Sequence, residues 1–91
     1  MSQVSPVPFA SLTALSVAVD SQLPRRGPRT RATVFSLCIE AVAFGREGED
    51  EQVGIRARSS ARLLLELACP ELDDQTLDVL ATACERAALG R

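Results

Sequence analysis

The chain has 91 residues and a net charge of −2, so it is long enough for one domain and lacks the basic excess of a general nucleic-acid binder. It contains no His and no Lys. That composition excludes imidazole catalysis, a zinc site completed by His, and Lys-dependent Schiff-base or P-loop chemistry. We therefore expect a non-enzymatic protein without metal or cofactor. Hydrophobic residues make up 46% of the chain but aromatic residues only 3%, so the core must consist mainly of Ala, Leu and Val. The basic residues are all Arg and the chain is rich in Ala, which suggests a bacterial source.

Residues 1–8 contain two prolines and are expected to form a flexible lead-in. They carry no basic stretch of the kind that begins a secretory signal, and no apolar run in the chain approaches the roughly 20 residues needed to cross a bilayer. The cytoplasm is the expected location. A first helix is predicted from near Pro8 to about Gln22, with one apolar stripe at helical spacing: Phe9, Leu12, Leu15 and Val19.

A connecting loop is predicted over residues 23–31, where Pro24, Gly27 and Pro28 interrupt helical structure. Four arginines lie in this segment: Arg25, Arg26, Arg29 and Arg31. They form either a patch that faces an anion, such as an acidic protein surface or phosphate, or an ordinary solvated loop.

The segment from Thr30 to Gly45 is predicted to be the central helix. Apolar residues cover most of its circumference, leaving a narrow polar line at Thr33, Ser36 and Glu40. A helix of this kind is expected to be buried on several sides. Gly45 is expected to end the helix, since glycine readily adopts positive φ.

An acidic run follows the central helix, comprising Glu47, Glu49, Asp50 and Glu51. Its spacing does not match the alternating ligands of a calcium-binding EF-hand loop, so we interpret it as the acidic start of the next helix. That third helix is predicted over about residues 51–68 and ends before Pro70. Its expected packing seam is Val53, Ala57, Ser60, Leu64 and Leu67. Arg62 and Glu66 are spaced to form an ion pair along it.

The last helix has the clearest local signals. Asp73 is placed as the N-cap, with Leu72 before it and Leu77 four residues after it as a hydrophobic staple, and Gly90 fits just beyond the helix end. Its predicted seam comprises Leu77, Leu80, Cys84 and Ala87. The three cysteines, Cys38, Cys69 and Cys84, lie on or beside apolar faces and are expected to act as small hydrophobic residues.

These segments predict an all-α fold, a compact bundle of about four short helices forming one domain over residues 9–91. Ordering the backbone costs about 1–2 kcal/mol per residue, and a core this poor in aromatic residues leaves little margin. We therefore expect additional burial against another chain, in a homodimer or in a complex with another protein. The side chains expected at that interface are Phe9, Leu12, Leu15, Val19, Leu64, Leu67, Leu77 and Leu80.

The expected function is protein–protein interaction, as a bacterial regulator or antiactivator that sequesters a larger protein such as a transcription factor. Two alternatives remain open. A DNA-binding regulator would use the arginines of residues 25–31, and its binding would weaken steeply with salt. A small-ligand binder would contain a cavity beside Phe35 and Phe44.

Overall fold

The computed structural model describes residues 7–48 and 50–90, and these residues form an all-helical bundle. The predicted fold class is confirmed. Residues 1–6 of the expected lead-in, and Glu49 of the acidic run, lie outside the described residues. The helices are α1 (Phe9–Gln22), α2 (Pro28–Arg46), α3 (Val53–Ala68) and α4 (Asp74–Ala88).

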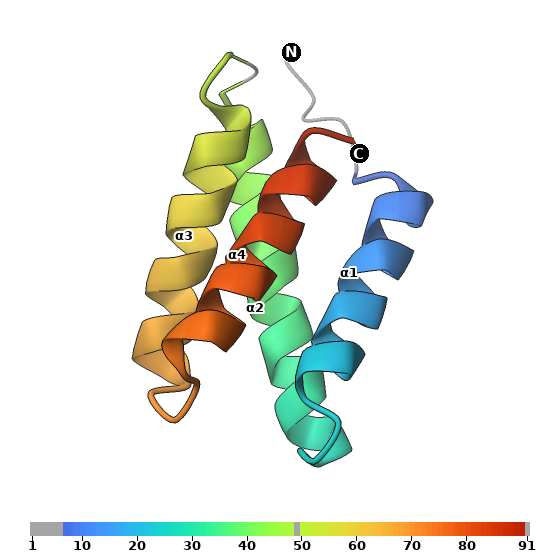
Figure 1. Cartoon of the computed structure of the whole chain (residues 1–91). Coiled ribbons are helices and arrows are strands. Elements are labelled where there is room, and N and C mark those ends of the chain that lie inside the picture. The colour runs from blue at the N-terminus through green and yellow to red at the C-terminus, as the bar shows by residue number, and fades with distance from the viewer. Residues whose placement is uncertain (1–6, 49, 91) are drawn as a thin grey trace.

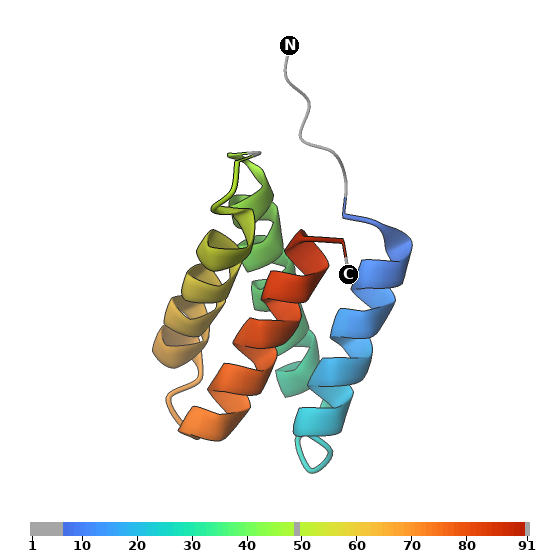
Figure 2. The ribbon, with the colours of Figure 1, turned by 45° about the horizontal axis from the view of Figure 1, so that its top comes forward.

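Successive helices run antiparallel, so the chain goes up and down the bundle (Figure 1). α2 and α4 each contact every other helix, whereas α1 and α3 lie on opposite sides and the described residues of the two do not touch. The expected central helix is therefore one of two central helices. α1 packs between α4 and α2 at one side of the bundle, and Figure 2 shows it beside α4 from a second direction.

The helix boundaries follow from residues that stop or start helical hydrogen bonding. Asp73 caps α4 as predicted, because its Oδ1 accepts a hydrogen bond of 2.8 Å from the backbone N–H of Thr76. Hydrogen bonding from Thr76 also lowers the pKa of Asp73 below its ordinary value. Beyond the other end of α4, Gly90 has φ of 76°, as expected for a residue that follows a helix.

The start of α3 lies at Val53, two residues after the predicted start. Asp50 turns the chain before it, since its Oδ1 accepts a hydrogen bond of 2.9 Å from the backbone N–H of Gln52. Asp50 also pairs with Arg56 at 3.0 Å. The hydrogen bonds from Arg56 and from Gln52 lower the pKa of Asp50. Asp50 therefore organises the turn, and it does not lie in the first turn of α3 as a dipole partner.

The core is made of Leu, Val, Ala and Cys side chains from all four helices and from the connections that follow α1 and α3. Within the described residues it comprises Leu15, Val19, Leu23, Val34, Cys38, Ala41, Val42, Ala57, Ala61, Leu65, Cys69, Leu72, Leu77, Leu80, Ala81, Cys84, Ala87 and Ala88. The predicted seam of α4 is buried, and so are both members of its hydrophobic staple. The three cysteines are buried free thiols, as expected for small hydrophobic residues.

The prediction for Gly45 was wrong. Gly45 lies inside α2, is buried, and marks the closest approach of α2 to α3. A Cβ atom at this position would lie 2.8 Å from the Cβ of Ala57 and 2.8 Å from the carbonyl oxygen of Val53. Glycine is thus required here because the backbones approach closely, and α2 continues past it to Arg46.

The predicted seam of α3 was displaced around the helix. The buried residues are Gly54, Ala57, Ala61 and Leu65, whereas Leu67 is 75% exposed. The predicted Val53 and Leu64 pack against the edge of the core and are only partly buried, while small side chains at the true seam let α3 approach α2 and α4. Of the predicted seam, only Ala57 belongs to this buried set.

The outer side of α2 also differs from the prediction. Thr33, Ser36 and Glu40 are exposed as predicted, but Ala32, Ala43 and Phe44 are exposed as well. Phe44 is 50% exposed, while Phe35 is half-buried against the core. α2 is therefore buried on less of its circumference than its apolar composition indicated.

Candidate protein-interaction surface

α1 is apolar on both its inner and its outer side, which distinguishes it from α3 and α4. Its inner side contributes Leu15 and Val19 to the core. Its apolar residues are nevertheless spread almost evenly around the helix, and Asp20 is its one charged residue. Apolar residues on more than one side of a helix are normally covered by neighbouring elements, yet one side of α1 is exposed in this fold.

The exposed side of α1 begins with mainly apolar residues, which we call the α1 face: Phe9, Ala10, Thr13, Ala14 and Val17. Polar residues Asp20 and Ser21 complete the exposed side at the end of the helix. The side chains of Phe9 and Val17 are 83% and 62% exposed. Thr13 lies between them, four residues from each. Its hydroxyl donates a hydrogen bond of 3.1 Å to the carbonyl oxygen of Phe9, so the one polar group of the face is already satisfied. The α1 face therefore offers a partner mainly apolar contact, with the carboxylate of Asp20, whose side chain is 59% exposed, one turn beyond Val17.

A shallow groove of about 960 Å³ adjoins the α1 face on its α4 side. Ala14 and Ala18 line it from α1, and Val79, Ala83 and Leu89 supply apolar side chains from α4 and the residue that follows it. The remaining lining residues are polar or charged: Asp78, Thr82, Glu85 and Arg86. The apolar surface of α1 thus continues into a groove with a charged rim, as at many protein interfaces.

The outer surfaces of α3 and α4 differ from the α1 face because their charges pair with one another. Arg58 lies 3.0 Å from Asp78 and 3.7 Å from Glu85. Arg62 contacts Asp74 and forms the predicted pair with Glu66 at 3.1 Å. Hydrogen bonding to Asp74 raises the pKa of Arg62. Ile55, Leu63 and Leu67 are also exposed on α3 at four-residue or eight-residue spacing, so α3 carries an apolar stripe beside these charges.

The predicted interface residues occupy three different environments. Leu15, Val19, Leu77 and Leu80 lie in the core, so a partner cannot reach them while the bundle is folded. Leu12 and Leu64 are half-buried. Phe9 and Leu67 are exposed, and they lie on α1 and α3, which do not contact each other within the described bundle. Phe9 therefore belongs to the α1 face, whereas Leu67 lies on a different surface of the bundle.

Sequence reasoning did not identify Ala10, Thr13, Ala14 and Val17 as surface residues. Its stripe of Phe9, Leu12, Leu15 and Val19 mixes an exposed residue with core residues, and it omits Ser11, which is buried. The missed signal is the lack of charge between Phe9 and Val19, because a solvated helix surface normally carries charged side chains.

The four arginines of residues 25–31 do not form one uniformly basic patch. Arg25 and Arg26 line a depression that also includes Glu71 and Asp73. Arg31 turns toward Asp20, with an ion-pair distance of 3.6 Å, and Arg29 is exposed in the first turn of α2. This mixture of charges gives little support to a phosphate-binding role.

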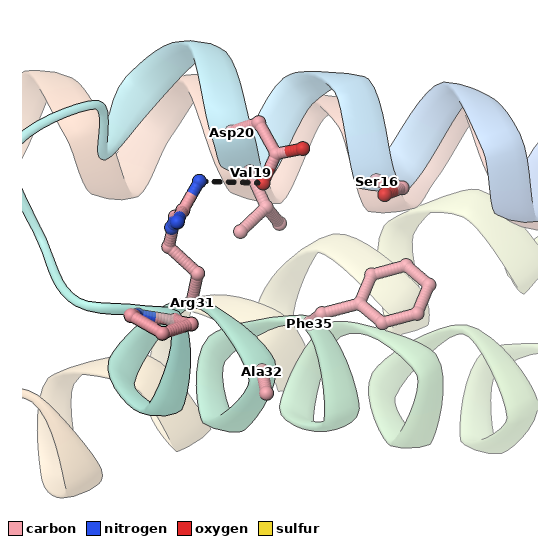
Figure 3. Close-up of a pocket in the computed structure, with 7 residues that line it drawn as sticks. Ser16, Val19, Asp20, Arg31, Ala32 and Phe35 are labelled. Carbon is pink, nitrogen blue, oxygen red and sulfur yellow. Dashed lines mark ion pairs between the residues drawn. The ribbon is translucent and has the colours of Figure 1, made fainter.

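A second cleft, of about 290 Å³, lies between α1 and α2 (Figure 3). Val19, Ala32 and Phe35 give it apolar walls, and the Arg31–Asp20 pair closes one end. The ligand-binding alternative predicted a cavity beside both Phe35 and Phe44. Phe35 lines this cleft, but Phe44 does not. Its volume is at the lower limit of typical ligand pockets. The Nε atom of Arg31 is buried without a hydrogen-bond partner among the described residues.

Other chemical groups of the bundle form no further candidate ligand site. Hydrogen bonding with Cys38 and burial raise the pKa of the Cys84 thiol, and burial raises that of Cys69, so both remain protonated. Across residues 7–48 and 50–90, no three His, Cys, Asp or Glu side chains are grouped so that they could hold a metal ion. None of the described helices has both the length and the apolar character needed to cross a membrane.

Comparisons of the chain with protein families, with curated proteins and with solved structures found no match.

Proposed function

We propose that this protein is a protein–protein interaction module and that the α1 face, with the adjoining α1–α4 groove, is its binding surface. The observation that carries the proposal is the combination of high exposure and missing charge on α1. Phe9 and Val17 project from a helix that has no charged residue before Asp20.

The exposed area gives a scale for the interaction. Fully burying a Phe or Val side chain contributes roughly 1.5–3 kcal/mol. Scaled by the exposed fractions of 83% and 62%, covering Phe9 and Val17 contributes roughly 2–4 kcal/mol. A micromolar complex requires about 8 kcal/mol. A partner must therefore supply apolar side chains of its own, and an apolar helix is a natural match.

Binding of this kind acts by covering a surface of the partner. It is consistent with the regulator or antiactivator that the sequence suggested, in which a small chain occupies a surface that a larger protein needs for its activity. Such a role requires no catalytic group, and α1 differs from the other helices in having Asp20 as its one charged residue.

Site-specific photo-crosslinking tests the proposal. A photoreactive phenylalanine analogue is placed at Val17, and at Glu40 on α2 as an exposed control, in the cells that naturally produce the chain. We expect covalent protein adducts from position 17 and few or none from position 40. Equal yields from both positions, or none from position 17, would refute the proposal. Circular dichroism of both variants checks that the bundle is intact.

A further inference from the structure

We infer that Cys38 on α2 and Cys84 on α4 are a disulfide-forming pair, and that oxidation of their thiols links the two central helices covalently. This pairing is separate from the proposed function, because both residues lie in the core and neither belongs to the α1 face. The observations that carry it are the contact between the two side chains, their complete burial, and the different position of the third cysteine.

The side chains of Cys38 and Cys84 meet although 46 residues separate them in the chain. The thiol of Cys84 donates a hydrogen bond of 3.8 Å to the carbonyl oxygen of Cys38, so its sulfur reaches the backbone of α2 at that residue. The two thiols also interact with each other, and this contact lowers the pKa of Cys38 and raises that of Cys84. Both side chains therefore occupy the space between α2 and α4.

Helices packed at ordinary distances can hold a disulfide between facing residues. Their axes lie about 8–10 Å apart, and each Cα atom lies about 2.3 Å from its own axis. Facing residues therefore have Cα atoms roughly 3.5–5.5 Å apart, and a disulfide requires about 4.4–6.8 Å, so the two ranges overlap. Ala41 and Ala81, one turn from Cys38 and Cys84 on the same helices, are fully buried, and their small side chains allow this approach.

Cys69 occupies a different position. It is the first residue after α3, and it is buried at the edge of the core beside Leu72. Burial has the largest effect on the pKa of Cys69 and raises it, whereas the effect of Cys38 on that pKa is the smallest. Among the described residues, the thiol of Cys69 forms no hydrogen bond with either of the other two. The fold therefore favours one of the three possible pairings.

A small disulfide such as oxidised glutathione can serve as the oxidant. The thiolate of one cysteine attacks a sulfur of this disulfide, which releases one glutathione thiolate and leaves a mixed disulfide on the protein. The second cysteine then displaces the other glutathione and closes the bond between Cys38 and Cys84. Two electrons pass from the protein thiols to the oxidant, and their two protons pass to the released glutathiones. Because both thiols are fully buried, the first attack requires local opening of the bundle.

Three alanine variants test the pairing, since each leaves two thiols and keeps a small apolar side chain in the core: Cys69→Ala, Cys84→Ala and Cys38→Ala. Each is incubated with reduced and oxidised glutathione in urea below its unfolding midpoint, then alkylated and analysed by mass spectrometry. We expect only Cys69→Ala to lose two hydrogen atoms and, after trypsin, to link residues 32–46 to residues 63–86. Equal internal linkage in all three variants, or none in Cys69→Ala, overturns the inference.

Two further measurements do not depend on how the other variants fold. The wild-type chain should give the same linked peptides with Cys69 alkylated, and a linked Cys69 overturns the pairing. Oxidised Cys69→Ala should also have a higher Tm than its reduced form, because the bond restricts the unfolded chain. A Tm that does not rise shows that the bond distorts α2 and α4, which overturns the pairing as a feature of the native fold.

Discussion

Gly45→Ala tests whether α2 and α3 approach as closely as the structure shows. The new Cβ would lie 2.8 Å from the Cβ of Ala57, 2.8 Å from the carbonyl oxygen of Val53 and 2.9 Å from the backbone nitrogen of Ala57. Ordinary contacts of a Cβ atom are 3.4–4 Å, so α3 must move by several tenths of an ångström. Two of these three neighbours are backbone atoms, which side-chain rotation cannot relieve.

The sign of the effect depends on two opposing contributions. Replacing glycine with alanine inside a helix stabilises it by about 1 kcal/mol. Forcing extra volume into a packed interior costs typically 1–3 kcal/mol, and a clash with backbone belongs at the upper end. The shift of α3 also disturbs the 3.0 Å hydrogen bond from Arg56 to the carbonyl oxygen of Gly45. The net expectation is a loss of about 1–2 kcal/mol in the free energy of unfolding.

Gly54→Ala is the matched control because it is also a buried helical glycine. Its nearest neighbours would be Cγ of Glu85 and Cδ1 of Leu89, each at 3.1 Å, and both belong to flexible side chains. The helical gain should therefore offset most of the crowding, leaving stability within about 0.5 kcal/mol of the wild type.

Urea denaturation followed by circular dichroism measures both variants, and thermal denaturation should give a lower Tm for Gly45→Ala by roughly 4–15 °C. If Gly45→Ala is as stable as the wild type, or if Gly54→Ala is the less stable of the two, the close approach of α2 and α3 at Gly45 is incorrect.

Three further predictions concern the cap of α4, the thiols and the ion pairs. Asp73→Ala should lower Tm because the N-cap hydrogen bond is lost. Folding lowers the pKa of Asp73 below its ordinary value of 3.8. The stabilisation by Asp73 is therefore present above pH 3.8 and is lost as the pH falls through the folded-state pKa. The difference in Tm between wild type and variant should shrink on acidification. An unchanged difference would contradict this. The buried cysteines should react slowly with Ellman's reagent in the native protein and rapidly in denaturant, and rapid native labelling would show that the core is open. Arg58→Ala should reduce the free energy of unfolding by no more than about 1 kcal/mol at low salt and by less at 1 M NaCl, whereas the exposed control Arg25→Ala should have little effect at either. A loss independent of salt would assign Arg58 a packing role.

The sequence was sufficient to predict the fold class and most of the helix boundaries because local residues determine them. Asp73 caps α4, and Gly90 follows its end. Pro28 is an exception, because it was predicted to interrupt helical structure in the loop of residues 23–31 and instead begins α2. These effects act within one or two turns of the chain. They require no knowledge of which helices are neighbours.

The packing faces were harder to predict because they depend on distances between helices. In α3, Ala57 was predicted to face the neighbouring helices and does so, but Gly54 and Ala61 were missed, while Leu67 was predicted there and is exposed. Gly45 was interpreted as a helix end because glycine readily adopts positive φ, and the sequence does not show which helix lies against it. Its role is visible only when α3 is placed beside it.

The candidate surface could be predicted only in part. Phe9 was expected at an interface and lies on the exposed surface, but the apolar residues of α1 are distributed too evenly for their spacing to show which side faces the core. The ion pairs that the arginines of α3 form with α4 could not be predicted from the sequence either. The pairing of Arg58 with Asp78 and Glu85 becomes apparent only when α3 and α4 lie side by side.

Hydrogen–deuterium exchange of α1 as a function of protein concentration tests most directly whether another chain covers its outer face. α1 lies at one side of the bundle, so its amides should exchange through local opening in the monomer and become protected when the α1 face is covered. A peptide from residues 9–22 should therefore gain protection as the concentration rises from nanomolar to tens of micromolar. A peptide from residues 53–68, on the opposite side, should change much less. Exchange of α1 that is the same at every concentration would contradict a homodimer formed through this face.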